Sequence, residues 1–186
     1  MNCKRLDEEF PWTEGPPRSP GMHLSDVIKS LMTELFGDMY PDNDDPRLQF
    51  EKGYLWEETL TMAFGKKAAV RPTEVELDGI ACSPDGIDFD DDGMFLEEYK
   101  CTMKGTKHQP KDNQYYMLQV KGYCHVLGCT RAIMRIFHLA GDWSPPSPDY
   151  RVWQFDFTKQ ELVENWIMLL NHAKTMEGYA SESAVE

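Results

Sequence analysis

The spacing of apolar positions changes several times along the chain and divides it into helices and strands. Residues 1–21 contain four prolines without any periodicity, which predicts a flexible N-terminal arm. Ser25 is expected to cap a helix that ends near Phe36 and that has the apolar stripe Leu24, Ile28, Leu31, Met32 and Leu35. After the polar segment 38–46, a second helix is predicted from about Leu48 to Phe64.

The period then shortens to two, which is typical of strands with one buried face. One strand is predicted over Val75–Ala81, a second over Gly86–Phe89 and a third over Met94–Thr102. The acidic segment Asp90–Gly93 predicts a tight turn between the last two. Together the three strands are expected to form a meander.

The helical period returns after Pro110 and continues to about Leu127. Two more strands follow, Arg131–Leu139 and Arg151–Phe157, joined by a proline-rich loop. Thr158 with Glu161 is typical of a capping box and predicts a last helix to about Met176. This order predicts a single α/β domain over residues 22–178 with a mixed sheet flanked by helices, followed by a short tail, 179–186.

Composition narrows the class of protein. The chain has 186 residues, of which 41 % are hydrophobic and 27 % charged, as in ordinary globular proteins. No apolar run reaches the ~18–20 residues of a membrane span, and the first residues do not resemble a signal peptide. We therefore expect a cytoplasmic protein without a membrane partner. The five cysteines are irregularly spaced, which favours reduced, mostly buried thiols over a disulfide framework.

Charge is unevenly distributed along the chain, whose formal net charge is -13. Ten acidic residues and no Lys or Arg lie between Glu74 and Glu98, whereas seven basic residues and one acid lie between Tyr99 and Arg135. The contrast is compatible with a cation site beside a phosphate track. On charge alone, two ordinary solvated faces are the simpler interpretation.

Glu98 and Lys100 are two residues apart in a predicted strand, so both side chains leave the same face of the sheet. The intervening turn brings Asp85 alongside Glu98 on the neighbouring strand. Two carboxylates that meet in this way repel each other unless a cation lies between them, and their oxygens suit Mg²⁺ or Mn²⁺. A surface ion pair and a turn-forming Asp would explain each residue separately.

Two helices carry further candidates. Glu57 follows Gly53 by four residues on the second helix, although an exposed glutamate is the simpler interpretation of that position alone. Tyr115, Gln119 and Tyr123 are spaced i, i+4, i+8, and their hydroxyl and amide groups could bind phosphate oxygens or orient water. Lys104 and Lys107, in the basic stretch, are candidate DNA contacts.

The assembled pattern resembles the PD-(D/E)xK nuclease superfamily, in the branch of lambda-type exonucleases and RecB-type nuclease domains. The matching motifs are Gly53…Glu57, Ala81–Gly86 (ACSPDG), Glu98–Lys100 (EYK) and Gln119…Tyr123. The resemblance implies a restriction-endonuclease-like core. It also implies that Glu57, Asp85, Glu98 and the carbonyl of Tyr99 bind one or two Mg²⁺ or Mn²⁺ ions.

In that family, the lysine that matches Lys100 positions or deprotonates the attacking water, and the glutamine that matches Gln119 belongs to the catalytic site. Residues that match Ser83 and Gln119 line a pocket for a terminal 5′-phosphate. Ser25 and Arg18 lie where this pocket has further members, although the surrounding sequence departs from the family pattern. No iron–sulfur cluster is expected, because no cysteine follows Cys129.

The function implied by the resemblance is a DNA exonuclease, encoded by a phage or used in phage-type recombination, that degrades duplexes from their 5′ ends. Its expected partners are DNA with free duplex ends and a single-strand annealing protein, and a homo-oligomer is left open. An endonuclease or a single-strand-specific nuclease on the same fold is the nearest alternative. A non-catalytic acidic protein that binds a partner, or an acidic DNA mimic, would not need Lys100 beside two carboxylates.

Overall fold

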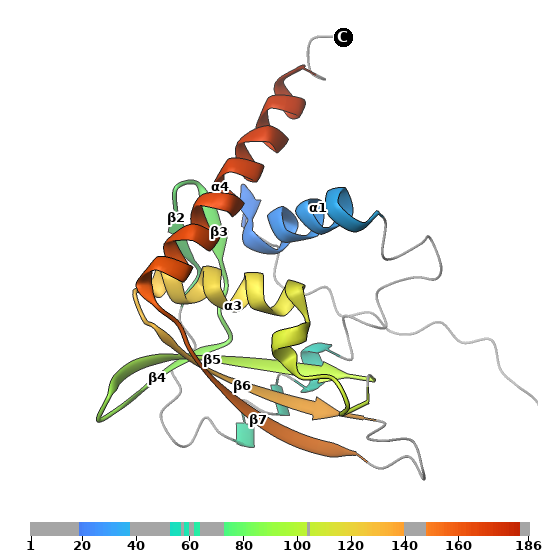
Figure 1. Ribbon diagram of the computed structural model, residues 1–186, viewed down its shortest axis with the longest axis vertical. Coiled ribbons are helices and arrows are strands. Elements are labelled where there is room, and N and C mark those ends of the chain that lie inside the picture. The colour runs from blue at the N-terminus through green and yellow to red at the C-terminus, as the bar shows by residue number, and fades with distance from the viewer. Residues whose placement is uncertain are drawn as a thin grey trace, which may run out of the picture.

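The main sheet contains four strands in the order β4-β5-β6-β7 (Figure 1). The computed structural model describes residues 19–37, 53–56, 58–59, 62–63, 73–103, 105–139 and 148–182, with side chains as far as residue 176. The strands are β4 (Gly86–Asp90), β5 (Gly93–Thr102), β6 (Arg131–His138) and β7 (Asp149–Asp156). β5 and β6 are parallel and the outer pairs are antiparallel, so the predicted mixed sheet is confirmed.

Three helices cover one face of this sheet in two layers (Figure 1). After the 3₁₀ turn η2 (Pro110–Asp112), α3 (Gln114–Leu127) crosses the sheet and connects β5 to the parallel strand β6. α1 (Leu24–Phe36) and α4 (Lys159–Glu182) pack against α3. The core lies between these layers and contains the buried side chains of Leu96, Met134, Val120, Cys124, Ile28, Trp166 and Leu169.

A second, smaller sheet corrects the predicted meander. It has the order β1-β3-β2 and consists of β1 (Met22–His23), β2 (Val75–Leu77) and β3 (Ile80–Cys82). The single strand predicted over residues 75–81 is therefore a hairpin. Its turn residues Asp78 and Gly79 have φ of 53° and 80°, the two positive values that a tight primed turn requires. Only β4 and β5 of the predicted meander are paired in the main sheet.

The first helix begins before its predicted cap. The N-cap is His23 rather than Ser25, because β1 pairs with β3 and leads directly into the helix. Leu24 is then buried against α3 at Gly122, where a Cβ would lie 2.8 Å from Leu24 Cδ2. The predicted stripe is correct through Met32, but Leu35 is 53 % exposed and Val27 is buried in addition.

Other predicted features are confirmed. Residues 53–56, 58–59 and 62–63 are helical, within the predicted second helix. Both hydrogen bonds of the predicted capping box are present. Thr158 N donates to Glu161 Oε2 at 2.8 Å, and Glu161 N donates to Thr158 Oγ1 at 3.2 Å. Cys82, Cys124 and Cys129 are buried thiols, and Cys101 is a half-buried one.

None of the helices in the described part of the chain is both long enough and apolar enough to cross a bilayer.

Asp78 joins the hairpin to the last helix, and this contact yields a stability prediction. Its Oδ2 accepts a hydrogen bond from Trp166 Nε1 at 2.8 Å, and Trp166 is buried. Asp78→Ala should lower the free energy of unfolding by about 2–4 kcal/mol, because it leaves an indole N–H unsatisfied and places Ala at positive φ. Asp78→Asn keeps an acceptor and tolerates this backbone, so it should cost much less. Urea denaturation measures both, and equal losses would contradict the assignment.

Candidate active site

The register between β4 and β5 brings two of the predicted acidic residues together. Gly86 lies opposite Glu97, so the next antiparallel step places Asp85 opposite Glu98. Asp85 Oδ2 accepts a hydrogen bond from the backbone N–H of Tyr99 at 2.7 Å. The Asp85 carboxylate therefore replaces a main-chain acceptor at the end of the β4–β5 ladder. The predicted meeting of Asp85 and Glu98 on adjacent strands is confirmed.

Glu98 and Lys100 form an ion pair on the face of β5 that α3 covers. Glu98 is only 1 % exposed, whereas the Lys100 side chain is 19 % exposed. Burial opposes the charged form of Lys100, but attraction by the carboxylates of Glu98 and Asp85 outweighs it and raises the lysine pKa. In the free protein the Lys100 ammonium is therefore paired with Glu98 and is stabilised further by the charge of Asp85.

α3 adds a polar pair to the same site. Gln119 Nε2 donates a hydrogen bond to the Tyr123 hydroxyl at 3.1 Å. Burial raises the pKa of Tyr123, and the neighbouring Glu98 carboxylate raises it further, so the hydroxyl stays protonated. Gln119 Oε1 is buried and has no hydrogen-bond partner among the described residues. An unsatisfied buried acceptor costs free energy, and it marks a place where a water or a ligand donor could bind.

Tyr116 also lies close to this polar pair on α3. The Lys100 Nζ lies 5.6 Å above the centre of the Tyr116 ring, and both Tyr115 and Tyr116 pack half-buried against the hydrophobic core. At 3.6 residues per turn, positions i and i+7 differ by about 20° around the helix, but positions i and i+8 differ by about 80°. The tighter stripe in the sequence was therefore Tyr116, Gln119 and Tyr123.

The donor set suits a hard divalent cation. Asp85 and Glu98 offer carboxylate oxygens, and the Tyr99 carbonyl directly follows Glu98 in the chain. Oxygen ligands of this kind match Mg²⁺ or Mn²⁺. No cluster of three or more His, Cys, Asp or Glu side chains able to hold an ion occurs among the described residues. The third predicted carboxylate, that of Glu57, lies outside them.

Ser83 is placed differently from the other motif residues. Its side chain is exposed, and Ser83 Oγ donates a hydrogen bond to Glu74 Oε2 at 3.1 Å. The same oxygen of Glu74 lies 3.5 Å from Nδ1 of the buried His23. A carboxylate beside Ser83 repels an anion, so a phosphate at Ser83 would require Glu74 to move or to be neutralised. Ser25 is half-buried in the first turn of α1, and Arg18 lies outside the described residues.

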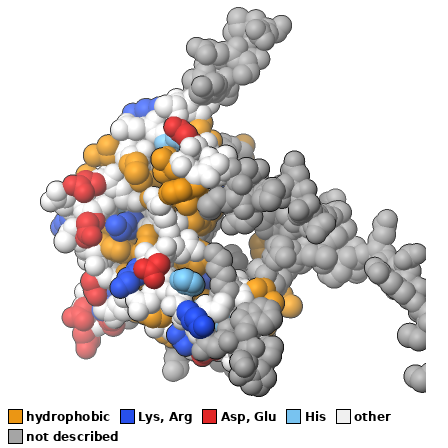
Figure 2. All heavy atoms as spheres, turned by 45° about the vertical axis from the view of Figure 1, so that its right-hand side comes forward, with side chains coloured by type: hydrophobic (Ala, Val, Ile, Leu, Met, Phe, Trp, Pro, Cys, Tyr) orange, Lys and Arg blue, Asp and Glu red, His pale blue; other side chains and the backbone are white. Residues whose placement is uncertain are grey.

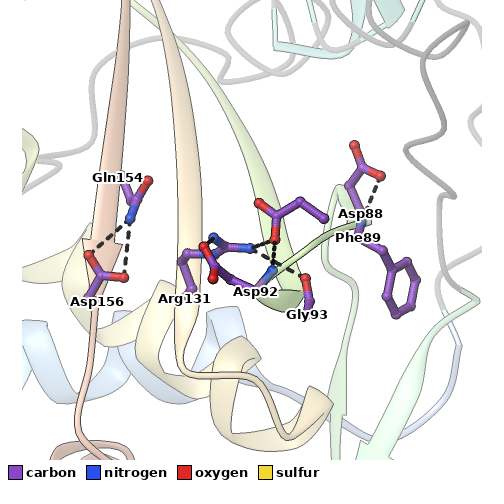
Figure 3. A network of polar contacts seen from close by, with 8 residues as sticks. Asp88, Phe89, Asp92, Gly93, Arg131, Gln154 and Asp156 are labelled. Carbon is purple, nitrogen blue, oxygen red and sulfur yellow. Dashed lines mark hydrogen bonds and ion pairs between the residues drawn. The ribbon is translucent and has the colours of Figure 1, made fainter.

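The acidic and basic stretches of the sequence pair with each other. Arg131 forms ion pairs with Asp90 and Asp92 in the β4–β5 turn and also bonds the Gly93 carbonyl (Figure 3). Arg135 donates two hydrogen bonds to the buried Glu97, at 2.7 and 2.8 Å. These contacts explain the alternation of charge better than two separate solvated faces do.

The remaining basic side chains form no broad patch on the face in Figure 2, where Lys and Arg lie singly among acidic and apolar side chains. Lys107 is exposed in the loop that follows β5. Lys104 lies outside the described residues. DNA contact by either lysine stays a prediction.

Two solved structures with a similar fold are exonucleases. A phage-related exonuclease from Haemophilus somnus superposes with a TM-score of 0.53 at 15 % sequence identity, covering 86 % of this chain and 83 % of that one. LHK-Exo, an alkaline exonuclease from Laribacter hongkongensis, was solved in complex with dAMP; it superposes with a TM-score of 0.51 at 14 % identity, covering 89 % of this chain and 93 % of that one.

The predicted α/β core, with a mixed sheet flanked by helices, is therefore confirmed, since the two exonucleases share this fold. No protein-family model and no curated protein matches the sequence.

The donor set predicts a specific response to metal. Mn²⁺ should raise the melting temperature, because an ion between Asp85 and Glu98 relieves their repulsion and binds only the folded state. Asp85→Ala should abolish the rise, whereas Asp88→Ala, three residues along the same segment, should keep it. Differential scanning fluorimetry with increasing Mn²⁺ measures the shift. Equal shifts in wild type and Asp85→Ala would show that the ion binds elsewhere.

Proposed function

We propose that the protein is a DNA nuclease that depends on Mg²⁺ or Mn²⁺ and that Asp85, Glu98 and Lys100 form its active site. The observation that carries the proposal is the ion pair of Glu98 with Lys100, beside the Asp85 carboxylate that the β4–β5 register brings next to Glu98. The similarity in fold to two exonucleases supports the same class of reaction. We include Glu57 and the Tyr99 carbonyl as further ligands, on the motif alone.

Each residue of the candidate site has a separate role in phosphodiester hydrolysis. The chemistry that a divalent cation supplies here is to lower the pKa of water and to offset charge on the phosphate. Asp85 and Glu98 hold that ion and are themselves held, by the Tyr99 N–H and by Lys100. Lys100, the more exposed partner of the ion pair, can donate hydrogen bonds to the attacking water or to a phosphate oxygen. Gln119 and Tyr123 present polar atoms to the same space and orient these groups.

We further propose that the substrate is duplex DNA with free ends, cut from the 5′ end as in phage-type recombination. The complex of LHK-Exo with dAMP, a deoxynucleotide, supports DNA as the substrate class. We propose a single-strand annealing protein as a partner, because it would bind the 3′ single strands that such a reaction leaves, and residues 22–178 as the nuclease domain. An endonuclease on the same fold is the competing function, because it would use the same metal ligands.

Hydrolysis should depend on both the ion and Lys100. With Mn²⁺ or Mg²⁺ the protein should shorten end-labelled linear duplex and leave a closed circle intact, and a chelator should stop the reaction. Lys100→Ala should slow hydrolysis by about 10²–10⁴-fold, the usual cost of losing a group that acts on the nucleophile. Lys174→Ala, which removes an exposed lysine on α4, is the matched control.

Because Lys100→Ala also leaves Glu98 buried without its cation, a thermal melt must first show that the variant is folded. A folded Lys100→Ala variant with more than a tenth of the wild-type rate would contradict the catalytic assignment. Cutting of closed circles as fast as linear DNA would instead favour the endonuclease.

Preference for a 5′-phosphate gives a separate prediction about Ser83 and Gln119. If both donate to that phosphate, alanine at either position should slow cleavage of phosphorylated ends about ten- to a hundredfold and leave unphosphorylated ends almost unchanged. Glu74→Gln should strengthen the preference, because it removes the charge beside Ser83. Glu76→Gln, an exposed acid on β2, is the control. If both kinds of end slow together, Gln119 acts on the metal site and not on the terminal phosphate.

A further inference from the structure

A cleft of about 640 Å³ opens beside the candidate active site, at the end of β5. Its apolar walls come from Met32 and Phe36 on α1 and from Ile136 on β6, and its polar side comes from the segment 105–114. The volume lies within the range of small-molecule sites, about 300–1,000 Å³. None of the motif residues for metal or phosphate binding lines this cleft.

The cleft is continuous with the Lys100 site through two shared residues. Thr102, which lines it, follows Lys100 by two residues on the same face of β5, a distance of about 6.6–6.8 Å along the strand. Tyr116, which also lines it, has its ring 5.6 Å from Lys100 Nζ. A molecule with a phosphate at Lys100 and a flat group one nucleotide unit away would therefore reach the cleft.

The lining has the chemistry of a nucleobase site. Phe36 lines the cleft and is 57 % exposed, so its ring offers a stacking surface. His108, Gln109 and Gln114 supply donors and acceptors at the other side. Among the described lining residues there is no Lys or Arg, and Asp112 is held by the Gln109 N–H at 3.2 Å. The cleft thus suits an uncharged base better than a phosphate.

Local contacts hold the polar side in place before any ligand binds. The 3₁₀ turn η2 is closed by a capping box between Gln109 and Asp112. Asn113 caps α3 by accepting a hydrogen bond from the Tyr116 N–H at 3.4 Å. A preformed pocket loses less entropy on binding than a loop that must first become ordered.

We propose that this cleft is a nucleobase subsite, which binds the base of the nucleotide whose phosphate lies at Lys100. The inference rests on the proposed function for the position of that phosphate. The base stacks on Phe36 and Tyr116, and its polar edge faces His108 and Gln114. The subsite favours intact nucleotides over abasic ones and contributes to binding rather than to the chemical step.

Binding of small ligands tests the subsite without hydrolysis. Deoxyadenosine 5′-monophosphate or deoxyribose 5-phosphate is titrated into the full chain in the presence of a chelator, which prevents hydrolysis. Binding is measured from the NMR chemical shifts of the backbone amides. The nucleotide should bind about tenfold more tightly, as expected for one stacked base, and should shift the amides of residues 105–114. Phe36→Ala should remove the difference, and Phe36→Trp should retain it. Leu35→Ala is the matched control, because Leu35 is also exposed at the end of α1 but does not line the cleft.

Equal affinities for the two compounds in wild type, or the same loss in Leu35→Ala as in Phe36→Ala, would overturn the proposal. Shifts confined to residues outside the cleft would overturn it as well. The proposed nuclease function is tested separately, by measuring hydrolysis of linear duplex with Mn²⁺. Hydrolysis without base discrimination would refute the subsite alone, and discrimination without hydrolysis would refute the nuclease alone.

Discussion

Antiparallel pairing between β4 and β5 fixes where the chemistry of this protein can occur. The acidic turn at residues 91–92 sets the register, and that register places Asp85 opposite Glu98 where the ladder ends. The Asp85 carboxylate accepts a hydrogen bond from the Tyr99 N–H, and this bond fixes the side chain relative to the backbone of β5. A shift of one residue would turn Glu98 and Lys100 to the other face of the sheet.

Burial of charge on the helix-covered face is the cost of this arrangement. Glu98 is almost fully buried, and an isolated carboxylate there would be strongly destabilising. Lys100 offsets that charge in the free protein, and a divalent cation would add to the same balance. The more distant acids are paired in turn with Arg131 and Arg135. Around the candidate site, two carboxylates and one ammonium leave a net negative charge in the free protein.

The parts of the site that follow from local periodicity could be predicted from the sequence. Alternation along β5 placed Glu98 and Lys100 on one face, and the turn brought Asp85 beside them. Contacts between side chains of different elements could not be predicted from periodicity. The bond between Ser83 and Glu74 joins residues nine positions apart in the hairpin region, and nothing in their spacing indicates it. Helix geometry does indicate Tyr116, because Tyr116 and Tyr123 are seven residues apart and differ by only about 20° around the helix.

The hairpin of β2 and β3 shows a second limit. Asp-Gly is a strong turn signal, but the flanking strands have only three residues each, so one longer strand fits the alternation equally well. What separates the two interpretations is the bond from Trp166 to Asp78, 88 residues away in sequence. The cleft beside Lys100 is likewise assembled from α1, β5, α3 and β6, and no single segment of the sequence predicts it.

The central claim is that Asp85, Glu98 and the Tyr99 carbonyl together hold a divalent cation next to Lys100. A crystal structure of the full chain grown with Mn²⁺, with data collected for anomalous scattering, tests this most directly. We expect an anomalous peak bonded to oxygens of both carboxylates and of the Tyr99 carbonyl, at about 2.0–2.3 Å. No peak at Asp85 and Glu98 with millimolar Mn²⁺ in the crystal would contradict it.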